Sequence, residues 1–71
     1  MNGRNIRLLR EERGMTLNQL ATLSGVSKSY ISYIERGMQK NPSIAILERI
    51  SLALGIEFME LIEQINDCSK D

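Results

Sequence analysis

The chain has 71 residues, with nine Lys and Arg, nine Asp and Glu, one Cys and no His. This length allows one small domain, and the absence of His and of a second Cys excludes the usual zinc sites and internal disulfides. No apolar run approaches the roughly 20 residues of a membrane span, so we expect a cytosolic protein.

The charges are segregated along the chain although they sum to zero. Residues 1–41 hold seven Lys and Arg against three Glu, a net charge of +4. Residues 42–71 hold two basic residues against six acidic ones, a net charge of −4. Such a dipole can turn a basic face toward a polyanion, although a chance segregation of solvated charges gives the same pattern.

The N-terminal part predicts an amphipathic helix over about residues 3–13. Ile6, Leu9 and Arg10 share one stripe of this helix. Gly14 follows as the stop that a left-handed C-terminal residue provides.

Two further helices follow, each with its own N-terminal cap. Thr16 and Gln19 form a T-x-x-Q capping box for the second helix, which Gly25 ends. Ser27 is the N-cap of the third. Two capped helices that a short glycine turn separates make a helix-turn-helix motif, here over about residues 16–36.

The second half of the sequence predicts two more helices and a tail. Pro42 and Ser43 begin the fourth helix, and the fifth covers about residues 57–65. The side chains expected to face inward from the fourth helix are Ile44, Leu47, Ile50 and Leu54. The expected fold is therefore all-α, a compact five-helix domain over residues 1–66 with a polar C-terminal tail over residues 67–71.

The third predicted helix has two chemically different faces. At about 100° per residue, Ile31 and Ile34 fall on one side. The other side carries Lys28, Ser29, Ser32, Tyr33 and Arg36, with Tyr30 at the boundary. Lys donates to guanine, Ser pairs with base edges or phosphates, and Tyr offers a hydroxyl or an apolar contact with a thymine methyl. This composition favours a nucleic-acid surface over an ordinary solvated face.

The segment TLNQLATLSGVSKSYISYIERG, residues 16–37, resembles the helix-turn-helix of the phage repressor and Cro family, often called the Xre type. The resemblance covers residues 4–65. Within the family, GVSKSYISYIERG, NPSIAILERISLALGI and GRNIRLLREERG are most similar to the SinR-type repressors of sporulating bacteria. It implies a bacterial or phage protein with a lambda-repressor-like domain, whose second helix crosses the DNA backbone and whose third lies in the major groove.

The resemblance also implies roles for individual residues. The base-contacting positions are Lys28, Ser29, Ser32 and Tyr33. The phosphate-contacting positions are Thr16, Leu17, Tyr30, Gln39, Lys40 and Asn41. Leu17 stands where many relatives have Gln, so only its backbone amide can hold a phosphate. Arg10 and Glu35 match a structural ion pair between the first and third helices.

A homodimer is expected because one such domain reads few bases, whereas two half-sites about 34 Å apart supply affinity and specificity. The candidate interface is the fifth helix, through Phe58, Met59, Ile62 and Ile65. Its apolar residues fall on two stripes, and a single core contact uses one. The alternative is that all of them pack internally.

The function expected from these features is a sequence-specific DNA-binding transcriptional regulator, a repressor, with double-stranded DNA as its partner. The alternative is a protein-interaction module, either an antirepressor or the heterodimer partner of a larger regulator. The chain has no His, no reactive Cys environment and no glycine-rich phosphate loop. We therefore expect no enzymatic activity, cofactor, metal, membrane association or small-molecule ligand.

Overall fold

The computed structural model describes residues 3–39 and 41–66. Over these ranges it contains five α-helices and no strand. The helices are α1 (Arg4–Glu12), α2 (Leu17–Ser24), α3 (Lys28–Glu35), α4 (Ile44–Leu54) and α5 (Phe58–Ile65). The all-α, five-helix expectation is confirmed, while the predicted contact of Lys40 and the predicted polar tail lie outside the described residues.

Side-chain caps set the beginnings of the middle three helices. Thr16 forms the complete capping box with Gln19 at α2. The hydroxyl of Ser27 accepts from the amide of Tyr30 at 3.1 Å. Ser43 does the same for α4, so Pro42 precedes that helix instead of forming its first residue as the sequence predicted. Each such cap contributes about 1 kcal/mol.

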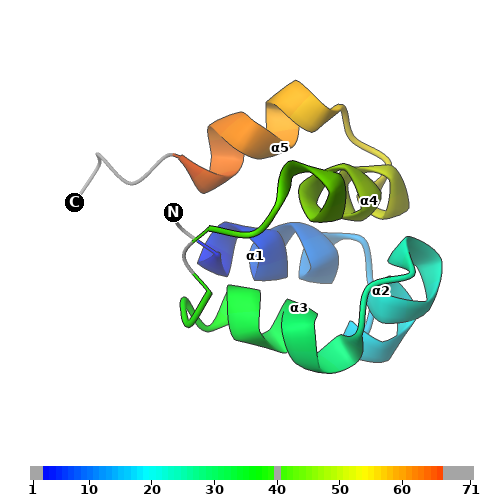
Figure 1. The fold of residues 1–71 in the computed structure, drawn as a ribbon. Helices are drawn as coiled ribbons and strands as arrows, with labels where there is room; N and C mark the ends of the chain where they lie inside the picture. The colour runs from blue at the N-terminus through cyan, green and yellow to red at the C-terminus, as the bar shows by residue number, and fades with distance from the viewer. Residues whose placement is uncertain (1–2, 40, 67–71) are drawn as a thin grey trace.

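The five helices pack into one small domain, with α1 in its middle (Figure 1). α1 contacts α3 on one side and α5 on the other, and α2 contacts both α3 and α4. Figure 1 shows α3 and α5 at opposite ends of the molecule, with α1 and α4 between them. The surfaces of α3 and α5 are therefore separate.

All five helices, and the turn after α2, contribute apolar side chains to one core. The buried members are Ile6, Leu20, Val26, Ile31, Ile34, Leu47, Ile50, Leu54, Leu61 and Ile65. Burying a side chain of this size stabilises the fold by about 1.5–3 kcal/mol. The inward placement predicted for Ile44 is wrong, because this first residue of α4 is 66% exposed. None of the helices described is long and apolar enough to span a membrane.

Polar contacts and one close approach fix the position of α1. The side-chain amide of Asn5 donates to the carbonyl of Gln64, and the guanidinium of Arg13 donates to the carbonyl of Leu54 at the end of α4. Gly3 is buried, and a Cβ added there would stand 1.8 Å from the carbonyl oxygen of Ile34. The start of α1 therefore lies directly against the backbone of α3.

Candidate nucleic-acid interface

The turn between α2 and α3 depends on the left-handed backbone of Gly25, which has φ 73°. Its amide donates to the carbonyl of Ala21 and closes the C-terminus of α2. The hydroxyl of Ser24 accepts from the amide of Val26 at 3.2 Å, which satisfies a buried donor. The turn thus sends the chain directly into the Ser27 cap, and the predicted helix-turn-helix is present.

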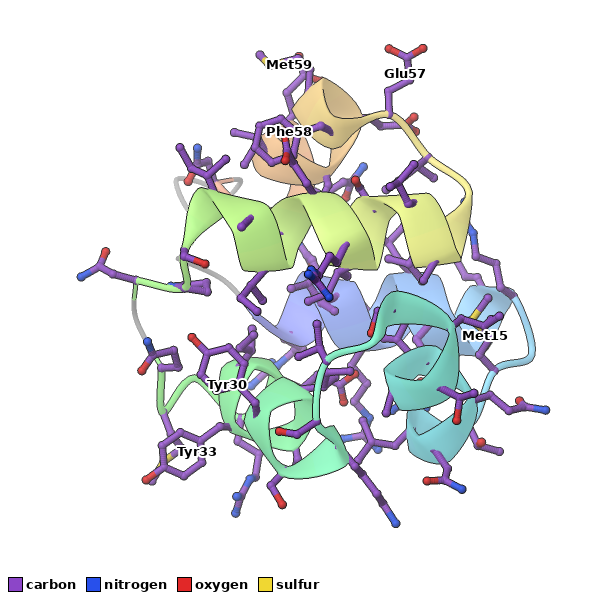
Figure 2. The ribbon with its side chains drawn as sticks, turned by 45° about the vertical axis from the view of Figure 1, so that its right-hand side comes forward. Met15, Tyr30, Tyr33, Glu57, Phe58 and Met59 are labelled. Carbon is purple, nitrogen blue, oxygen red and sulfur yellow. The ribbon has the colours of Figure 1, made fainter. Side chains whose placement is uncertain are left out.

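The two predicted faces of α3 are found in the structure. Ile31 and Ile34 are fully buried. On the outer side Lys28 and Ser29 are exposed and Tyr33 is 45% exposed, while Ser32 is partly exposed. Figure 2 shows the Tyr33 ring at the end of the molecule opposite Phe58 and Met59. The residues predicted to contact bases therefore share one outward surface.

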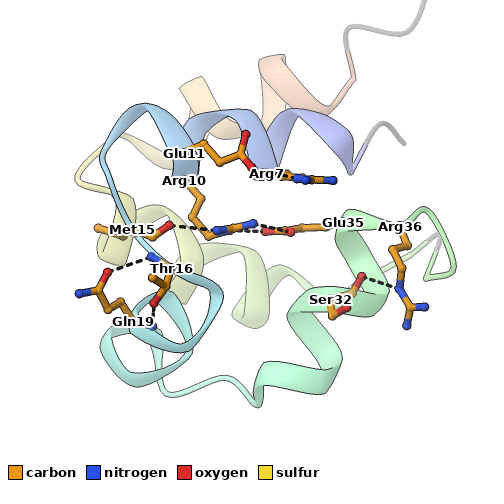
Figure 3. A network of polar contacts seen from close by, with 9 residues as sticks. All are labelled: Arg7, Arg10, Glu11, Met15, Thr16, Gln19, Ser32, Glu35 and Arg36. Carbon is orange, nitrogen blue, oxygen red and sulfur yellow. Dashed lines mark hydrogen bonds and ion pairs between the residues drawn. The ribbon is translucent and has the colours of Figure 1, made fainter.

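A bidentate ion pair holds α3 against α1 (Figure 3). Arg10 Nε lies 2.8 Å from Glu35 Oε2, and Arg10 Nη2 lies 3.1 Å from Glu35 Oε1. A third bond runs from Arg10 Nη1 to the carbonyl of Met15 at 2.9 Å, at the entrance to α2. The side chains of Arg10 and Glu35 are 11% and 6% exposed. Their hydrogen bonding raises the pKa of Arg10 above its ordinary value, while burial opposes the rise.

This ion pair also shapes the charge of the interface. Glu35 is the carboxylate that α3 carries, and it points to Arg10 on the protein side of the helix. The exposed charges of the outer side are Lys28 and, just after α3, Arg36. A negatively charged phosphate approaching this side therefore meets cations first.

Arg36 lies on the same surface, although it was not among the predicted DNA contacts. Its guanidinium carbon lies 5.9 Å from the centre of the Tyr33 ring, within the range of a cation–π contact. Its Nε also donates to the carbonyl of Ser32 at 3.4 Å (Figure 3). The helical wheel already placed Arg36 on the face of the predicted contacts. That position could have identified Arg36 as a further candidate DNA-contacting residue.

A side-chain hydrogen bond connects the loop after α3 to that helix. Gln39 Nε2 donates to the hydroxyl of Tyr30 at 3.2 Å and to the carbonyl of Asn41 at 3.5 Å. Tyr30 and Gln39 are both half-buried, whereas Asn41 is exposed. Tyr30, predicted to touch phosphate, therefore also positions the loop segment around the predicted phosphate contacts Gln39 and Asn41.

The start of α2 is a helix N-terminus closed by a capping box. The capping box uses the amides of Thr16 and Gln19, at 2.8 and 3.1 Å from their acceptors. In any α-helix the first amides lack acceptors within the helix, and the helix dipole favours negative charge there. Among the described residues no His, Cys, Asp or Glu cluster has the composition of a metal site.

At the opposite end of the molecule, α5 is less available than the sequence predicted. Ile65 is 3% exposed and belongs to the core, so its predicted place in an interface is wrong. Phe58 and Ile62 are partly buried against the core, and Met59 remains 63% exposed. Leu52 of α4 is 80% exposed and was not predicted to belong to this surface. It lines a hollow that also includes Phe58.

The helix-turn-helix family model matches residues 6–61, so the chain belongs to this family. Over 63 residues it is 52% identical to the HTH-type transcriptional regulator SlrR of Bacillus subtilis, covering 89% of this chain and 41% of SlrR. Over 71 residues it is 41% identical to the HTH-type transcriptional regulator SinR of the same organism, covering 100% of this chain and 64% of SinR. The chain therefore spans less than two thirds of these relatives.

A solved structure with the same fold contains nucleic acid. It is a crystal structure of SinR, the master regulator for biofilm formation, in complex with DNA. The superposition has a TM-score of 0.82 and 45% sequence identity, and covers 87% of this chain and 98% of the SinR chain. The resemblance to the SinR-type branch of the family is therefore confirmed in both sequence and fold.

Proposed function

We propose that this protein is a sequence-specific DNA-binding transcriptional regulator, a repressor, that reads the major groove with α3. The observation that carries the proposal is the outer side of α3, where Lys28, Ser29 and Tyr33 are exposed opposite two fully buried isoleucines. An α-helix with its side chains is about 10–12 Å across, and the major groove is about 12 Å wide. The DNA complex of the similar SinR chain supports the same reading.

The contacts divide into base readers and phosphate holders. Lys28, Ser29, Ser32 and Tyr33 are proposed to meet base edges. Thr16, the Leu17 amide, Tyr30, Gln39, Lys40 and Asn41 are proposed to hold phosphates on either side. Phosphate contacts fix the register of the helix on the duplex, and base contacts supply the sequence preference.

The salt dependence of binding tests the proposal. Each phosphate contact releases counterions, so log K is expected to fall by about 0.9 per contact for each unit rise in log salt concentration. With several proposed contacts per domain, the fall should be steep. Titration of a duplex selected from a random pool, at a series of salt concentrations, measures the slope. An affinity that stays constant over the series would contradict the proposal.

Lys28→Ala should relax the preference for one base pair in each half-site. Loss of a Lys–guanine contact costs about 1–3 kcal/mol of discrimination at that position. Competition binding with single-position variants of the selected duplex measures this preference. Arg7→Ala is the matched control, because it removes one exposed cation from α1. Equal base preferences in Lys28→Ala and the unchanged protein would remove Lys28 from the readout.

The proposed active form is a homodimer, whose interface consists of α5 and the neighbouring part of α4. Leu52 and Met59 are mostly exposed there, with Phe58 and Ile62 partly exposed beside them. Apolar groups in such a surface favour a protein partner. Figure 2 shows Phe58 and Met59 far from Tyr33, so an interface at this end would not cover the outer side of α3.

Met59→Glu should shift the dimer toward monomer, since it would bury a carboxylate without a partner. Leu23→Glu is the matched control: Leu23 is 62% exposed, against 63% for Met59, but lies on α2. Sedimentation equilibrium at tens of micromolar compares the two variants with the unchanged chain. A purely monomeric unchanged chain, or equal effects of both variants, would contradict an interface through α5.

A further inference from the structure

A hollow lies on the outer side of α3, where this helix meets the start of α2. Its lining residues are Leu17, Lys28, Ser29, Ser32, Tyr33 and Arg36. Five of these six come from α3 or the residue directly after it, and all five carry polar groups. Leu17 is the first residue of α2 and the one aliphatic side chain in the lining.

The apolar wall of this hollow is fixed in place. Leu17 is half-buried and packs against the core, so its side chain is held by the protein interior. It is also the residue that follows the Thr16 cap, whose two hydrogen bonds with Gln19 define the first turn of α2. Leu17 therefore presents an apolar edge that the core supports from below.

The lining also includes Tyr33 and, beside it, Arg36. This guanidinium lies 5.9 Å from the centre of the Tyr33 ring and is itself bonded to the carbonyl of Ser32. At this distance the guanidinium attracts the face of the ring. The hollow thus has an aliphatic wall, an aromatic wall and a polar rim that includes Lys28 and Ser29.

The chemistry of this hollow selects among the groups on base edges. In the major groove each base pair presents hydrogen-bond donors and acceptors, and the apolar group is the C5 methyl of thymine. A purine edge, or the exocyclic amine of cytosine, would place polar atoms against the Leu17 side chain, which offers them no hydrogen bond. A thymine methyl would instead contact Leu17 while the neighbouring base edges meet the polar rim.

We propose that this hollow receives the C5 methyl of one thymine in each half-site, with Leu17 as a specificity-determining residue. The inference rests on the proposed function, since it requires α3 to lie in the major groove. It gives the Leu17 side chain a role besides that of its backbone amide.

Replacing single thymines by deoxyuridine tests the inference without touching the protein. Deoxyuridine lacks only the methyl group and keeps the pairing edge of thymine. In a duplex selected from a random pool, one replacement in one half-site should weaken binding about three- to fivefold, the effect of removing one buried methyl group. Replacements at the other thymines should have smaller effects.

Variants of Leu17 test whether the Leu17 side chain contacts the methyl group of the sensitive thymine. In Leu17→Ala the difference between the thymine and deoxyuridine duplexes should disappear at the sensitive position. Leu17→Met keeps an apolar side chain of similar size and should retain the difference. Thermal unfolding of both variants shows whether the domain remains folded, and the comparison of two duplexes on one variant cancels any general loss of affinity.

Two outcomes would overturn the inference and leave DNA binding intact. One is a selected duplex that binds equally well after every deoxyuridine replacement. The other is a sensitive thymine that stays sensitive in a folded Leu17→Ala variant. If no duplex is enriched and bound at all, the proposed function fails together with the inference.

Discussion

Arg10→Ala should lower the free energy of unfolding by about 3 kcal/mol, the cost of leaving one partner of a buried ion pair behind. The Glu35 side chain is 6% exposed, and the carbonyl of Met15 would lose the same donor. For a domain of this length such a loss corresponds to a fall in Tm of about 12–24 °C. Thermal and denaturant unfolding followed by circular dichroism measure it.

Two controls separate the buried pair from a general effect of charge. Arg7→Ala breaks the pair with Glu11, whose members are 60% and 48% exposed, and should cost less than about 0.5 kcal/mol. Arg10→Met combined with Glu35→Leu removes both charges and should recover much of the stability, because no charge stays buried alone. Equal losses in Arg10→Ala and Arg7→Ala would contradict a structural role for the pair.

Gly3→Ala is the second substitution with a large expected effect. The new Cβ would stand 1.8 Å from the carbonyl oxygen of Ile34 and 2.8 Å from its carbonyl carbon. Backbone cannot rotate away as a side chain can, so α1 must move away from α3. We expect a loss of about 1–3 kcal/mol in the free energy of unfolding, the usual cost of overpacking. DNA affinity should fall as well, because α3 carries the proposed contacts.

Gly14→Ala distinguishes this clash from the general effect of replacing a glycine. Gly14 has φ 67° and open space around its Cβ, so its replacement strains the backbone by about 1 kcal/mol without displacing a neighbour. Gly3 has φ −66°, which alanine adopts readily. If Gly3→Ala were as stable as the unchanged protein, the close contact between α1 and α3 would be absent in solution.

The helix boundaries could be predicted because they depend on local chemistry. Thr16, Ser27 and Ser43 each accept a backbone amide at the start of a helix, and Gly25 and Gly55 adopt the left-handed conformation at helix ends. These interactions involve neighbours in the sequence, so the sequence displays them directly. The two-faced character of α3 follows from periodicity for the same reason.

The extent of packing could not be predicted in the same way. Ile44 shares the spacing of the buried residues of α4, but it is the first residue of that helix and is exposed. Ile65 lies on the same stripe as Leu61, and both are buried. Periodicity gives the direction of a side chain, whereas burial depends on how far the neighbouring helix extends. The exposure of Leu52 depends on the same long-range geometry.

The site was predictable in part. Lys28, Ser29 and Tyr33 share an outward face that the helical wheel displays. The partnership of Arg10 with Glu35 joins residues that are 25 positions apart, and only the family resemblance indicated it. The contacts of Arg36 with Tyr33 and of Tyr30 with Gln39 depend on side-chain conformations that residue spacing does not specify.

Selection of duplexes from a random pool by the full chain tests most directly whether the outer side of α3 reads DNA. The expected result is enrichment of one sequence with two inverted half-sites, whose centres lie about 34 Å apart, or about 10 base pairs. A pool that stays unenriched after repeated rounds, with a folded protein, would contradict the account.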